Sequence, residues 1–462
     1  MNRLLISAAH KSSGKTTISI GLCRALTQQG SKVQAFKKGP DYIDPMWLGR
    51  ASGRPCYNLD FYTMQHAEIL TRLQHHSADA DLSLIEGNKG LYDGLDLEGS
   101  NSNAALARLT RTPVILVIDV QGMTRGIAPL VLGYQAFEPE LNIAGIILNQ
   151  VRGQRHEDKL QAVLEHYTDV PVIGAVFHDP SMVIDERHLG LVPSNENREA
   201  EQRIDYIGQK IGAQVNLDTL RALAASAPAL PEAAPPQAAT LPSPDVTLAI
   251  AQDAAFGFYY PDDLEALQAA GARLVPFSPL VDPALPACDG LFLGGGFPET
   301  QMQALAANSA MRQSVRAAIE QGLPTYAECG GLMYLARSLQ WRGQTSDMVG
   351  VVPGDIRMHD RPVGRGYVRL QETACHPWPT EQTDTSADFP AHEFHYSALE
   401  NLPGDLDYAY QVRRGMGIDG AHDGLVINNL LASYSHLRDT SYHHWARRFV
   451  QFVRSRRANS HV

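Results

Sequence analysis

The chain lacks the features that would tie it to a membrane, to secretion or to a nucleic-acid backbone. No apolar run approaches the ~20 residues of a membrane-spanning helix, and the N-terminal MNRLLISAAH has no apolar core followed by a cleavage site. No block of consecutive Lys or Arg is present, and 50 acidic against 39 basic residues give a formal charge of −11. We therefore expect a cytoplasmic protein without nucleic-acid or membrane partners.

Cysteine is also scarce, with five residues in a chain of 462, and none of them forms a CxxC pair or a metal-ligand spacing. The sequence thus gives no indication of a disulfide framework or a zinc cluster. What the chain does have is length and a hydrophobic content of 44%, which suffice for two or three domains with cores of their own.

The first half alternates short apolar runs with helical patterns. The apolar runs are RLLISAA, KVQAFK, DLSLIEG, PVILVIDV and NIAGIILN. Strands this apolar indicate a parallel sheet with helices on both faces, so we expect an α/β domain over 1–225. A Pro/Ala-rich segment at 226–245 predicts a linker.

The alternation restarts after the linker, with VTLAIAQD, ARLVPF, DGLFLGGG and PTYAECGG as strands and with helices over DDLEALQAAGA and MRQSVRAAIEQG. This pattern predicts a second α/β domain over 246–462, which ends in an amphipathic helix. We find no internal repeat, which favours two dissimilar domains.

Residues 9–16, AHKSSGKT, fit the phosphate-loop pattern G-x-x-x-x-G-K-[ST], except that Ala9 replaces the first glycine. The loop follows an apolar run and opens a helix, where backbone N–H groups and the helix dipole form an anion site. Lys15 would reach the β/γ-phosphates, and Thr16 would ligate Mg²⁺; the alternative is a Gly-Lys turn before an ordinary helix. The predicted nucleotide-binding residues are Ser12, Ser13, Gly14, Lys15, Thr16 and Thr17.

Three carboxylates follow strands of the same domain. Asp41 and Asp44 lie in FKKGPDYIDP, and Glu86 lies in LIEGNKGLYDG. Ligands of doubly wound folds bind at this edge of the sheet, so we expect all three side chains to face the nucleotide, with Thr16, Asp41 and Glu86 around a metal. Taken singly, each is equally well read as a turn aspartate or a solvated acid.

The second domain carries a candidate nucleophile in YAECGGLMYLA, residues 326–336, which reads as strand, sharp turn and helix. We expect the helix N-terminus at Gly330 to lower the pKa of Cys329, and Gly330 and Gly331 to leave room for a substrate beside the sulfur. The general base would be His436 in LLASYSHLRD. The alternative is a buried cysteine that acts as a small hydrophobic side chain.

Two further segments bear on this site. Bare amides in DGLFLGGGFPE, at Gly294, Gly295 and Gly296, would form an oxyanion hole, which we assign to Gly295, Gly296 and Gly330. AHEFHYS at 391–397 lacks the H-E-x-x-H spacing of a zinc protease, and it predicts a strand or loop that contacts substrate or serves structure alone.

With these motifs assembled, the whole chain resembles the cobyrinic acid a,c-diamide synthase family, glutamine-dependent amide ligases of tetrapyrrole biosynthesis. The resemblance rests on eight motifs in family order: KKGPDYIDP with SGRPCYNLD, IEGNKGLYDG, ERHLGLVPSNE, LGGGFPE, AECGGLMYL, GRGYV, AHEFHYS and ASYSHL. It implies an ATP-dependent domain similar to dethiobiotin synthetase, followed by a class I, triad-type glutamine amidotransferase domain.

The resemblance also implies residue roles. Lys15 and Thr16 would hold ATP and Mg²⁺, Asp41 and Glu86 would serve metal binding and phosphate transfer, and Asp44 would assist them. Cys329 would attack L-glutamine, with His436 as its base. The implied reaction is amidation of tetrapyrrole acetate carboxylates through an acyl phosphate, with two sites in one chain protecting water-sensitive intermediates. The sequence is also compatible with a homodimer.

Three departures from the family pattern stand out. Ala9 replaces a glycine, and Arg438 occupies the position two residues after the histidine, where amidotransferases of the broader class carry Glu. The third triad member is therefore missing or comes from elsewhere. Asn88 and Lys89 replace the usual Val-Met, which favours sirohaem over cobyrinic or hydrogenobyrinic acid as the substrate.

Two other functions are compatible with these residues. The first is a non-catalytic nucleotide-switch regulator with a degenerate amidotransferase domain, since Ala9 and Arg438 are changes that such decay would produce. The second is an amide ligase for an acid that is not a tetrapyrrole. The retention of four residues favours an enzyme over the regulator, namely Lys15, Thr16, Cys329 and His436.

Overall fold

In the computed structural model, the chain divides into two compact units, Met1–Gln237 and Ala238–Val462. The structure describes residues 1–187, 190–197, 199–230, 242–379 and 387–459. The predicted linker at 226–245 and the ERHLGLVPSNE motif therefore lie partly outside the described residues. Within those ranges, no helix has the length and apolar composition that crossing a membrane requires.

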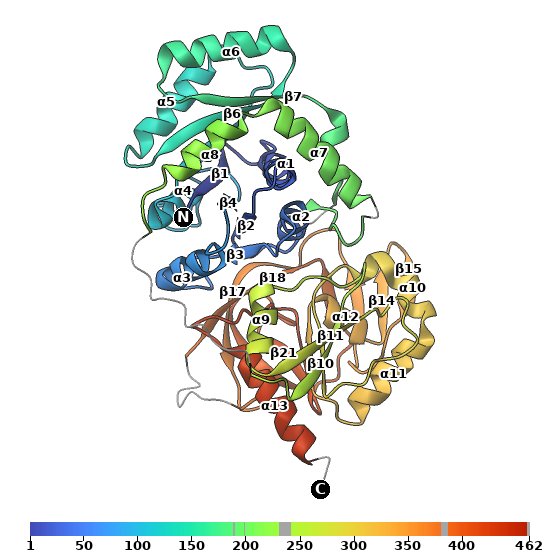
Figure 1. The fold of residues 1–462 in the computed structure, drawn as a ribbon. Coiled ribbons are helices and arrows are strands. Elements are labelled where there is room, and N and C mark those ends of the chain that lie inside the picture. Colours follow the sequence, from blue (N-terminus) through green and yellow to red (C-terminus); the bar gives the residue numbers. More distant parts are fainter. Residues whose placement is uncertain (188–189, 198, 231–241, 380–386, 460–462) are drawn as a thin grey trace. The chain divides into compact units, whose positions relative to one another are not determined.

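The first unit is built on a parallel sheet of seven strands in the order β3-β2-β4-β1-β5-β6-β7 (Figure 1). These strands are β1 (Arg3–Ala8), β2 (Val33–Lys38), β3 (Tyr57–Leu59), β4 (Leu82–Glu86), β5 (Val114–Asp119), β6 (Ile143–Val151) and β7 (Val172–Phe177). Every residue of β1 and β2 is buried, as expected for strands covered on both faces. The five apolar runs of the first half are all strands, which confirms that prediction.

Helices cover both faces of this sheet. They are α1 (Lys15–Gln28), α2 (Ile43–Ser52), α3 (His66–His76), α4 (Asn103–Thr110), α5 (Ile127–Phe137), α6 (Gln154–Tyr167), α7 (Ala200–Gln214) and α8 (Leu217–Ala225). One core cluster joins Leu5 and its neighbours to α3, α4, α5 and α6. Helices α1, α2 and α7 pack against one another, and α1 also contacts β1, β2 and β4. A short helix η1 (Pro180–Met182) and a hairpin of β8 (Glu186–Arg187) and β9 (Gly190–Leu191) complete the described part of the unit.

The second unit contains a mixed sheet of nine strands in the order β11-β10-β12-β13-β22-β21-β20-β17-β18. The parallel part comprises β10 (Val246–Ala251), β11 (Ala272–Phe277), β12 (Gly290–Leu293), β13 (Thr325–Glu328) and β22 (Leu430–Ser433). The antiparallel part adds β17 (Gly364–Glu372), β18 (Phe389–His395), β20 (Asp407–Arg414) and β21 (His422–Ile427). The predicted strands are confirmed, and the antiparallel half is a feature that the apolar runs did not indicate.

The remaining elements of this unit are a second sheet and six helices among the described residues. The sheet consists of β14 (Ser338–Trp341), β15 (Gln344–Asp347), β16 (Asp355–Met358) and β19 (Ser397–Glu400). The helices are α9 (Pro261–Ala269), η2 (Pro298–Gln301), α10 (Met302–Ala307), α11 (Ser309–Glu320), α12 (Gly330–Leu335) and α13 (Trp445–Asn459). The predicted final helix is thus confirmed as α13.

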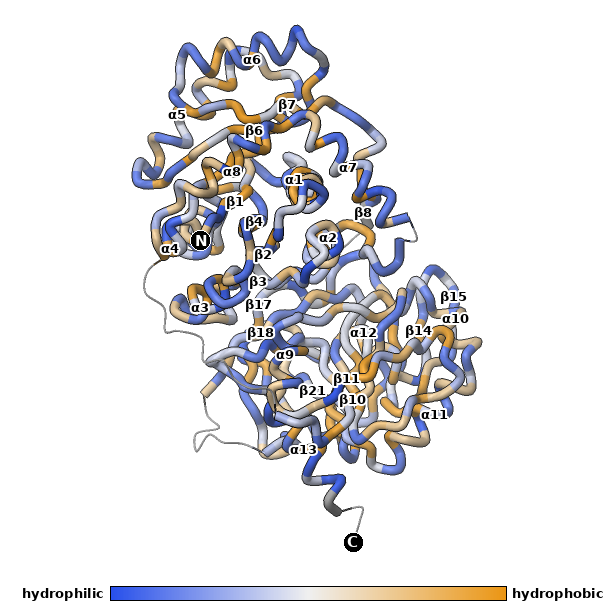
Figure 2. The backbone as a smooth tube through the Cα atoms, in the orientation of Figure 1, coloured by the Kyte–Doolittle hydropathy of each residue, from blue (hydrophilic) through white to orange (hydrophobic). Residues whose placement is uncertain are grey.

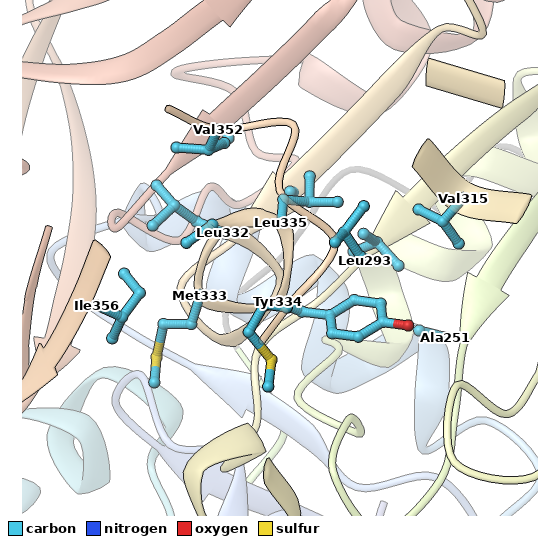
Figure 3. Close-up of a cluster of buried hydrophobic side chains, with 14 of the residues drawn as sticks. Ala251, Leu293, Val315, Leu332, Met333, Tyr334, Leu335, Val352 and Ile356 are labelled. Atoms are coloured by element: carbon cyan, nitrogen blue, oxygen red, sulfur yellow. The ribbon is translucent and has the colours of Figure 1, made fainter. Parts of the chain in front are cut away.

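Hydrophobic residues concentrate in the strands of each unit, whereas helix α6 is mostly hydrophilic (Figure 2). In the second unit, the short helix α12 lies inside the core, with every residue buried. Figure 3 shows side chains of this helix directed toward Val352, Ile356 and Leu293. A helix embedded in this way gives its first turn a fixed position.

Candidate active sites

The phosphate loop connects β1 to α1 as the sequence predicts. Gly14 caps the helix in the left-handed region, at φ 82°. The side-chain amide of Asn149, from β6, donates to the carbonyl of Ser13 at 2.9 Å, and a β-carbon on Gly14 would lie 2.2 Å from the same Nδ2 atom. Glycine is therefore required here for two independent reasons. Ser12 also has a positive φ, 66°, which marks a tightly wound loop.

Ala9 occupies its position without backbone strain. It does not belong to the described residues with positive φ, so the conformation needs no glycine. Its amide donates to the carbonyl of Val117 at 3.2 Å, and its carbonyl accepts from the Tyr134 hydroxyl. The departure from the phosphate-loop pattern thus leaves the loop geometry intact.

The three predicted carboxylates converge at the carboxyl edge of the parallel sheet, around an ammonium that the sequence analysis missed. The Nζ atom of Lys37, in β2, lies 2.5 Å from Asp44, 3.2 Å from Glu86 and 3.9 Å from Asp41. The Thr16 hydroxyl donates to Glu86 at 2.5 Å and to Asp44 at 3.4 Å. A lysine at the end of the predicted strand KVQAFK was the available signal, because a buried charge needs partners.

Burial and the close charges shift the pKa values of this cluster. Burial, reinforced by Asp44, raises the pKa of Asp41 to about 7. Burial also raises the pKa of Glu86. For Asp44, burial acts to raise the pKa, but Lys37, Lys15 and the Thr16 hydroxyl together outweigh it and lower the pKa. Burial, together with Lys37, lowers the pKa of Lys15, so this lysine carries a charge that an incoming polyanion would stabilise.

The same cluster fits a magnesium ion. The Oε2 atom of Glu86 is buried and has no hydrogen-bond partner among the described residues, which leaves one carboxylate oxygen for a cation. No group of three or more His, Cys, Asp or Glu in the described ranges is arranged to hold a metal by itself. Mg²⁺ does not require one, because it is bound by one or two carboxylates with phosphate oxygens and water.

Asn88 has internal partners, although the sequence suggested a substrate contact. Its Oδ1 atom accepts from Lys38 at 3.1 Å, and its backbone N–H and C=O both bond to the side chain of Asn103. Lys89 is exposed and has a positive φ of 44°. Asn88 therefore holds the loop after β4 against β2 and α4.

The second site is centred on Cys329, at a sharp bend between β13 and α12. Its backbone has φ 46° and ψ −99°, a strained conformation for a residue other than glycine. The amide of Cys329 donates to Ser433 at 2.7 Å, and Sγ lies 4.0 Å from the Phe394 carbonyl oxygen. The predicted succession of strand, turn and helix is confirmed, and the strain is typical of a nucleophile elbow.

One expectation about this bend is wrong. Burial, followed by the carboxylates of Glu299 and Glu328, raises the pKa of Cys329, although a hydrogen bond from the Gly330 amide acts in the predicted, lowering direction. β-carbons on Gly330 and Gly331 would lie 2.9 Å from the Gly296 nitrogen and 2.2 Å from the Leu293 carbonyl oxygen, so these glycines allow close backbone packing. The expected room for a substrate beside the sulfur stays a prediction.

The glycine-rich loop after β12 lies beside both catalytic candidates. Gly294 does not have the bare amide we predicted, because it donates to the Tyr259 hydroxyl at 3.0 Å. The close approach of Gly330 to the Gly296 nitrogen brings that amide to the bend. A β-carbon on Gly295 would lie 2.7 Å from Cε1 of His436. The oxyanion assignment of Gly295, Gly296 and Gly330 stays a prediction.

His436 follows β22, which pairs in parallel with β13 so that Glu328 and Ser433 are in register. Its Nδ1 atom lies 3.4 Å from Oε2 of Glu328, and its ring stacks on His392 with centroids 4.9 Å apart. Glu328 was not predicted as a site residue, although an acid at the buried end of a strand, next to the nucleophile, was a visible signal.

Arg438, two residues after His436, forms an ion pair with Asp262. Its Nη2 atom donates to Asp262 at 2.5 Å, and its guanidinium lies 4.3 Å from the centre of the Tyr260 ring. Both members of the ion pair are buried. Arg438 therefore anchors the histidine segment to α9.

The AHEFHYS motif forms most of β18 and its turn to β19. The carboxylate of Glu393 accepts from the amides of Met416 and Gly417 at 2.7 and 2.8 Å. The ring of His395 stacks on Tyr434 at 3.9 Å. Glu393 and His395 therefore order the loop after β20 and the segment after β22, while His392 directly contacts His436 by stacking.

Comparisons with known proteins identify a domain in each half of the chain. Residues 5–191 match the model of the CobQ/CobB/MinD/ParA nucleotide binding domain, and residues 247–441 match the CobB/CobQ-like glutamine amidotransferase domain. Relatives named cobyrinate a,c-diamide synthase occur in Magnetococcus marinus, with 46% identity over 98% of this chain and 97% of theirs, and in Methanosarcina acetivorans, with 41% identity over 99% and 96%. A relative of the same name in Listeria monocytogenes is 40% identical over 95% of this chain and 96% of its own.

These relatives match nearly the full length of both chains, and each half matches the domain that its geometry suggests. A phosphate loop with a carboxylate cluster falls in the nucleotide-binding half, and a strained cysteine with a neighbouring histidine segment falls in the amidotransferase half. The chain belongs to the cobyrinate a,c-diamide synthase family.

Proposed function

We propose that this chain uses ATP and glutamine to amidate acetate side-chain carboxylates of cobyrinate. The observation that carries the proposal is the pairing, in one chain, of a phosphate loop facing Glu86 and a strained Cys329 beside the segment of His436. The printed name of the relatives supplies the substrate class.

The first unit would activate the carboxylate. A carboxylate does not condense with ammonia at neutral pH, because its oxygen is a poor leaving group, so ATP first converts it to an acyl phosphate. Lys15 and the loop amides would bind the phosphates, and Lys37 would stabilise charge that develops during transfer. Thr16 and Glu86, with Asp41, would hold Mg²⁺, which supplies charge neutralisation at the phosphates.

The second unit would release ammonia. The thiol of Cys329 gives its proton to His436 as Sγ bonds to the side-chain carbonyl carbon of glutamine, with the developing oxyanion near the amides of Gly296 and Gly330. The histidine returns the proton to the departing nitrogen, the C–N bond breaks, and ammonia leaves. Water then hydrolyses the thioester to glutamate. Because burial raises the pKa of Cys329, proton transfer to the base accompanies the attack.

The choice between tetrapyrroles favours cobyrinate. The Asn88–Lys89 pair suggested sirohaem, but the side chain and backbone of Asn88 bond within the protein. We therefore assign Asn88 no part in selecting the macrocycle.

The proposal is tested by incubating the protein with ATP, Mg²⁺ and glutamine, together with cobyrinate, hydrogenobyrinate or sirohaem, and weighing the products. We expect two carboxyl-to-carboxamide conversions on cobyrinate. Cys329→Ala should abolish the glutamine-dependent reaction and retain the reaction with added ammonium salt. Equally poor ammonia release by wild type and Cys329→Ala would refute the enzymatic assignment, and conversion of sirohaem alone would refute the substrate.

A further inference from the structure

The carboxylate of Glu328 has two oxygens with different surroundings. Its Oε1 atom accepts from the backbone amide of Leu437 at 2.9 Å and from the hydroxyl of Tyr326 at 2.5 Å. Its Oε2 atom faces Nδ1 of His436 at 3.4 Å. All of these side chains are buried. The two donors fix the plane of the carboxylate, so one oxygen is held toward the imidazole ring.

This arrangement selects one tautomer of the histidine. A carboxylate accepts hydrogen bonds and cannot donate them, so the ring nitrogen that faces it is the one that carries hydrogen. The hydrogen then sits on Nδ1, and Nε2 has the lone pair that a general base needs. In serine proteases, a buried aspartate holds the catalytic histidine in the same way.

We propose that Glu328 is the positioning residue that completes a Cys329–His436–Glu328 triad, in place of the acid that other class I amidotransferases carry two residues after the histidine. The inference rests on the proposed glutamine hydrolysis at Cys329. Strand register makes the replacement feasible, because Glu328 ends β13 and lies level with Ser433, three residues before the histidine. Arg438, at the usual position of the acid, is committed to Asp262.

The amide variant Glu328→Gln separates this role from a structural one. Its carbonyl oxygen would keep the two bonds from Leu437 and Tyr326, which places the NH₂ group at the former Oε2 position. That group donates to Nδ1, so the hydrogen moves to Nε2 and the base is lost while the packing is kept. Glu328→Asp retains the charge and is the conservative control.

The experiment measures kcat and KM for glutamine hydrolysis by the full-length chain. We expect Glu328→Gln to lower kcat by about 10²- to 10⁴-fold with KM changed less than about threefold, since the acid acts on the base and not on glutamine. The kcat of Glu328→Asp should be at least about tenfold higher than that of Glu328→Gln. Tyr326→Phe, which removes one bond to Oε1 and leaves Oε2 in place, should cost far less than Glu328→Gln.

Two controls make the outcome decisive. Near-ultraviolet circular dichroism of Glu328→Gln should match wild type, and its ammonium-dependent amidation should persist. If Glu328→Gln hydrolyses glutamine within about threefold of wild type, or if KM alone changes, the triad assignment is overturned while the proposed function stands. If Glu328→Gln has lost its native spectrum, the activity of Glu328→Asp decides instead. A folded Glu328→Asp that is as inactive as Cys329→Ala would overturn the proposal that a carboxylate at this position orients the histidine. A wild type that releases no ammonia from glutamine rejects the proposed function itself.

Discussion

The Nζ atom of Lys37 lies 2.5 Å from Oδ2 of Asp44, at the edge of the sheet where the phosphate loop begins its helix. Glu86 lies 3.2 Å from the same ammonium, and Lys37 is almost completely buried. Breaking a buried ion pair leaves charges without compensation, which is far more costly than breaking one at the surface.

Lys37→Met should therefore destabilise the first unit by about 3–5 kcal/mol at neutral pH, because Asp44 and Glu86 would lose their shared cation. Urea denaturation measures this change. Lys210→Met is the matched control, since the side chain of Lys210 is 42% exposed and lies 3.9 Å from Asp179, and its loss should cost no more than about 1 kcal/mol. Equal effects of the two substitutions would contradict a stabilising role for the buried cluster.

Glu86→Gln should weaken magnesium binding, because it removes the charge of the carboxylate whose Oε2 atom has no protein partner in the described structure. We expect the Mg²⁺ concentration for half-maximal rate to rise at least about tenfold. The assay uses ammonium salt as the nitrogen source, so the amidotransferase site does not contribute. Asp79→Asn, at an exposed ion pair with Arg54, serves as control, and a Glu86→Gln titration that overlays wild type would exclude Glu86 as a ligand.

The backbone conformation at Cys329 predicts that substitution by glycine is less destabilising than substitution by alanine. With φ at 46°, an alanine there is strained, whereas glycine is not, so Cys329→Gly should be more stable than Cys329→Ala by about 1 kcal/mol despite the greater freedom of glycine in the unfolded chain. Both variants should lack glutaminase activity. Ala336→Gly, at φ −64°, should instead destabilise the protein. Chemical denaturation of the three variants tests this contrast, and a less stable Cys329→Gly would show that the bend relaxes.

His376 gives the second unit a dependence of stability on pH. Burial lowers the pKa of His376 to about 3, although Glu372 lies nearby, and Nε2 instead shares a 3.2 Å hydrogen bond with the Tyr410 hydroxyl. A folded pKa below the unfolded value of about 6.5 means that the stabilising contribution is present above pH ~6.5 and is lost as the pH falls toward the folded pKa.

Unfolding free energies of wild type and His376→Gln should therefore converge as the pH falls from about 6.5 to 5, by about 1.4 kcal/mol for each pH unit. The range stays above the region in which Glu372 titrates, so that carboxylate does not distort the comparison. Parallel pH profiles for the two proteins would contradict a neutral, buried His376.

The parts of the fold that follow from local pattern could be predicted, and the parts that depend on burial and on distant pairing could not. Apolar runs identified the parallel strands, and because such strands end at one edge, Asp41 and Glu86 could be expected to converge. Strands such as β20, DYAYQVRR, are half exposed and carry charges, so they lack that signal.

The errors at the cysteine have the same origin. A helix N-terminus is visible in the sequence, but the surrounding core that raises the pKa of Cys329 is assembled from distant segments. Lys37 and Glu328 were not predicted as site residues, because the sequence does not show which groups surround a charged residue in a strand. For Glu328, those partners are His436 and Leu437, more than a hundred residues away.

The ordinary backbone of Ala9 has a consequence for how related chains are to be judged. A first glycine in the phosphate loop is commonly treated as obligatory, yet the conformation here is open to any L-amino acid, and its demands fall on Gly14 instead. A small side chain at the first position is therefore no sign of a nucleotide site in decay. Loss of the second glycine, which abuts Asn149, would be such a sign.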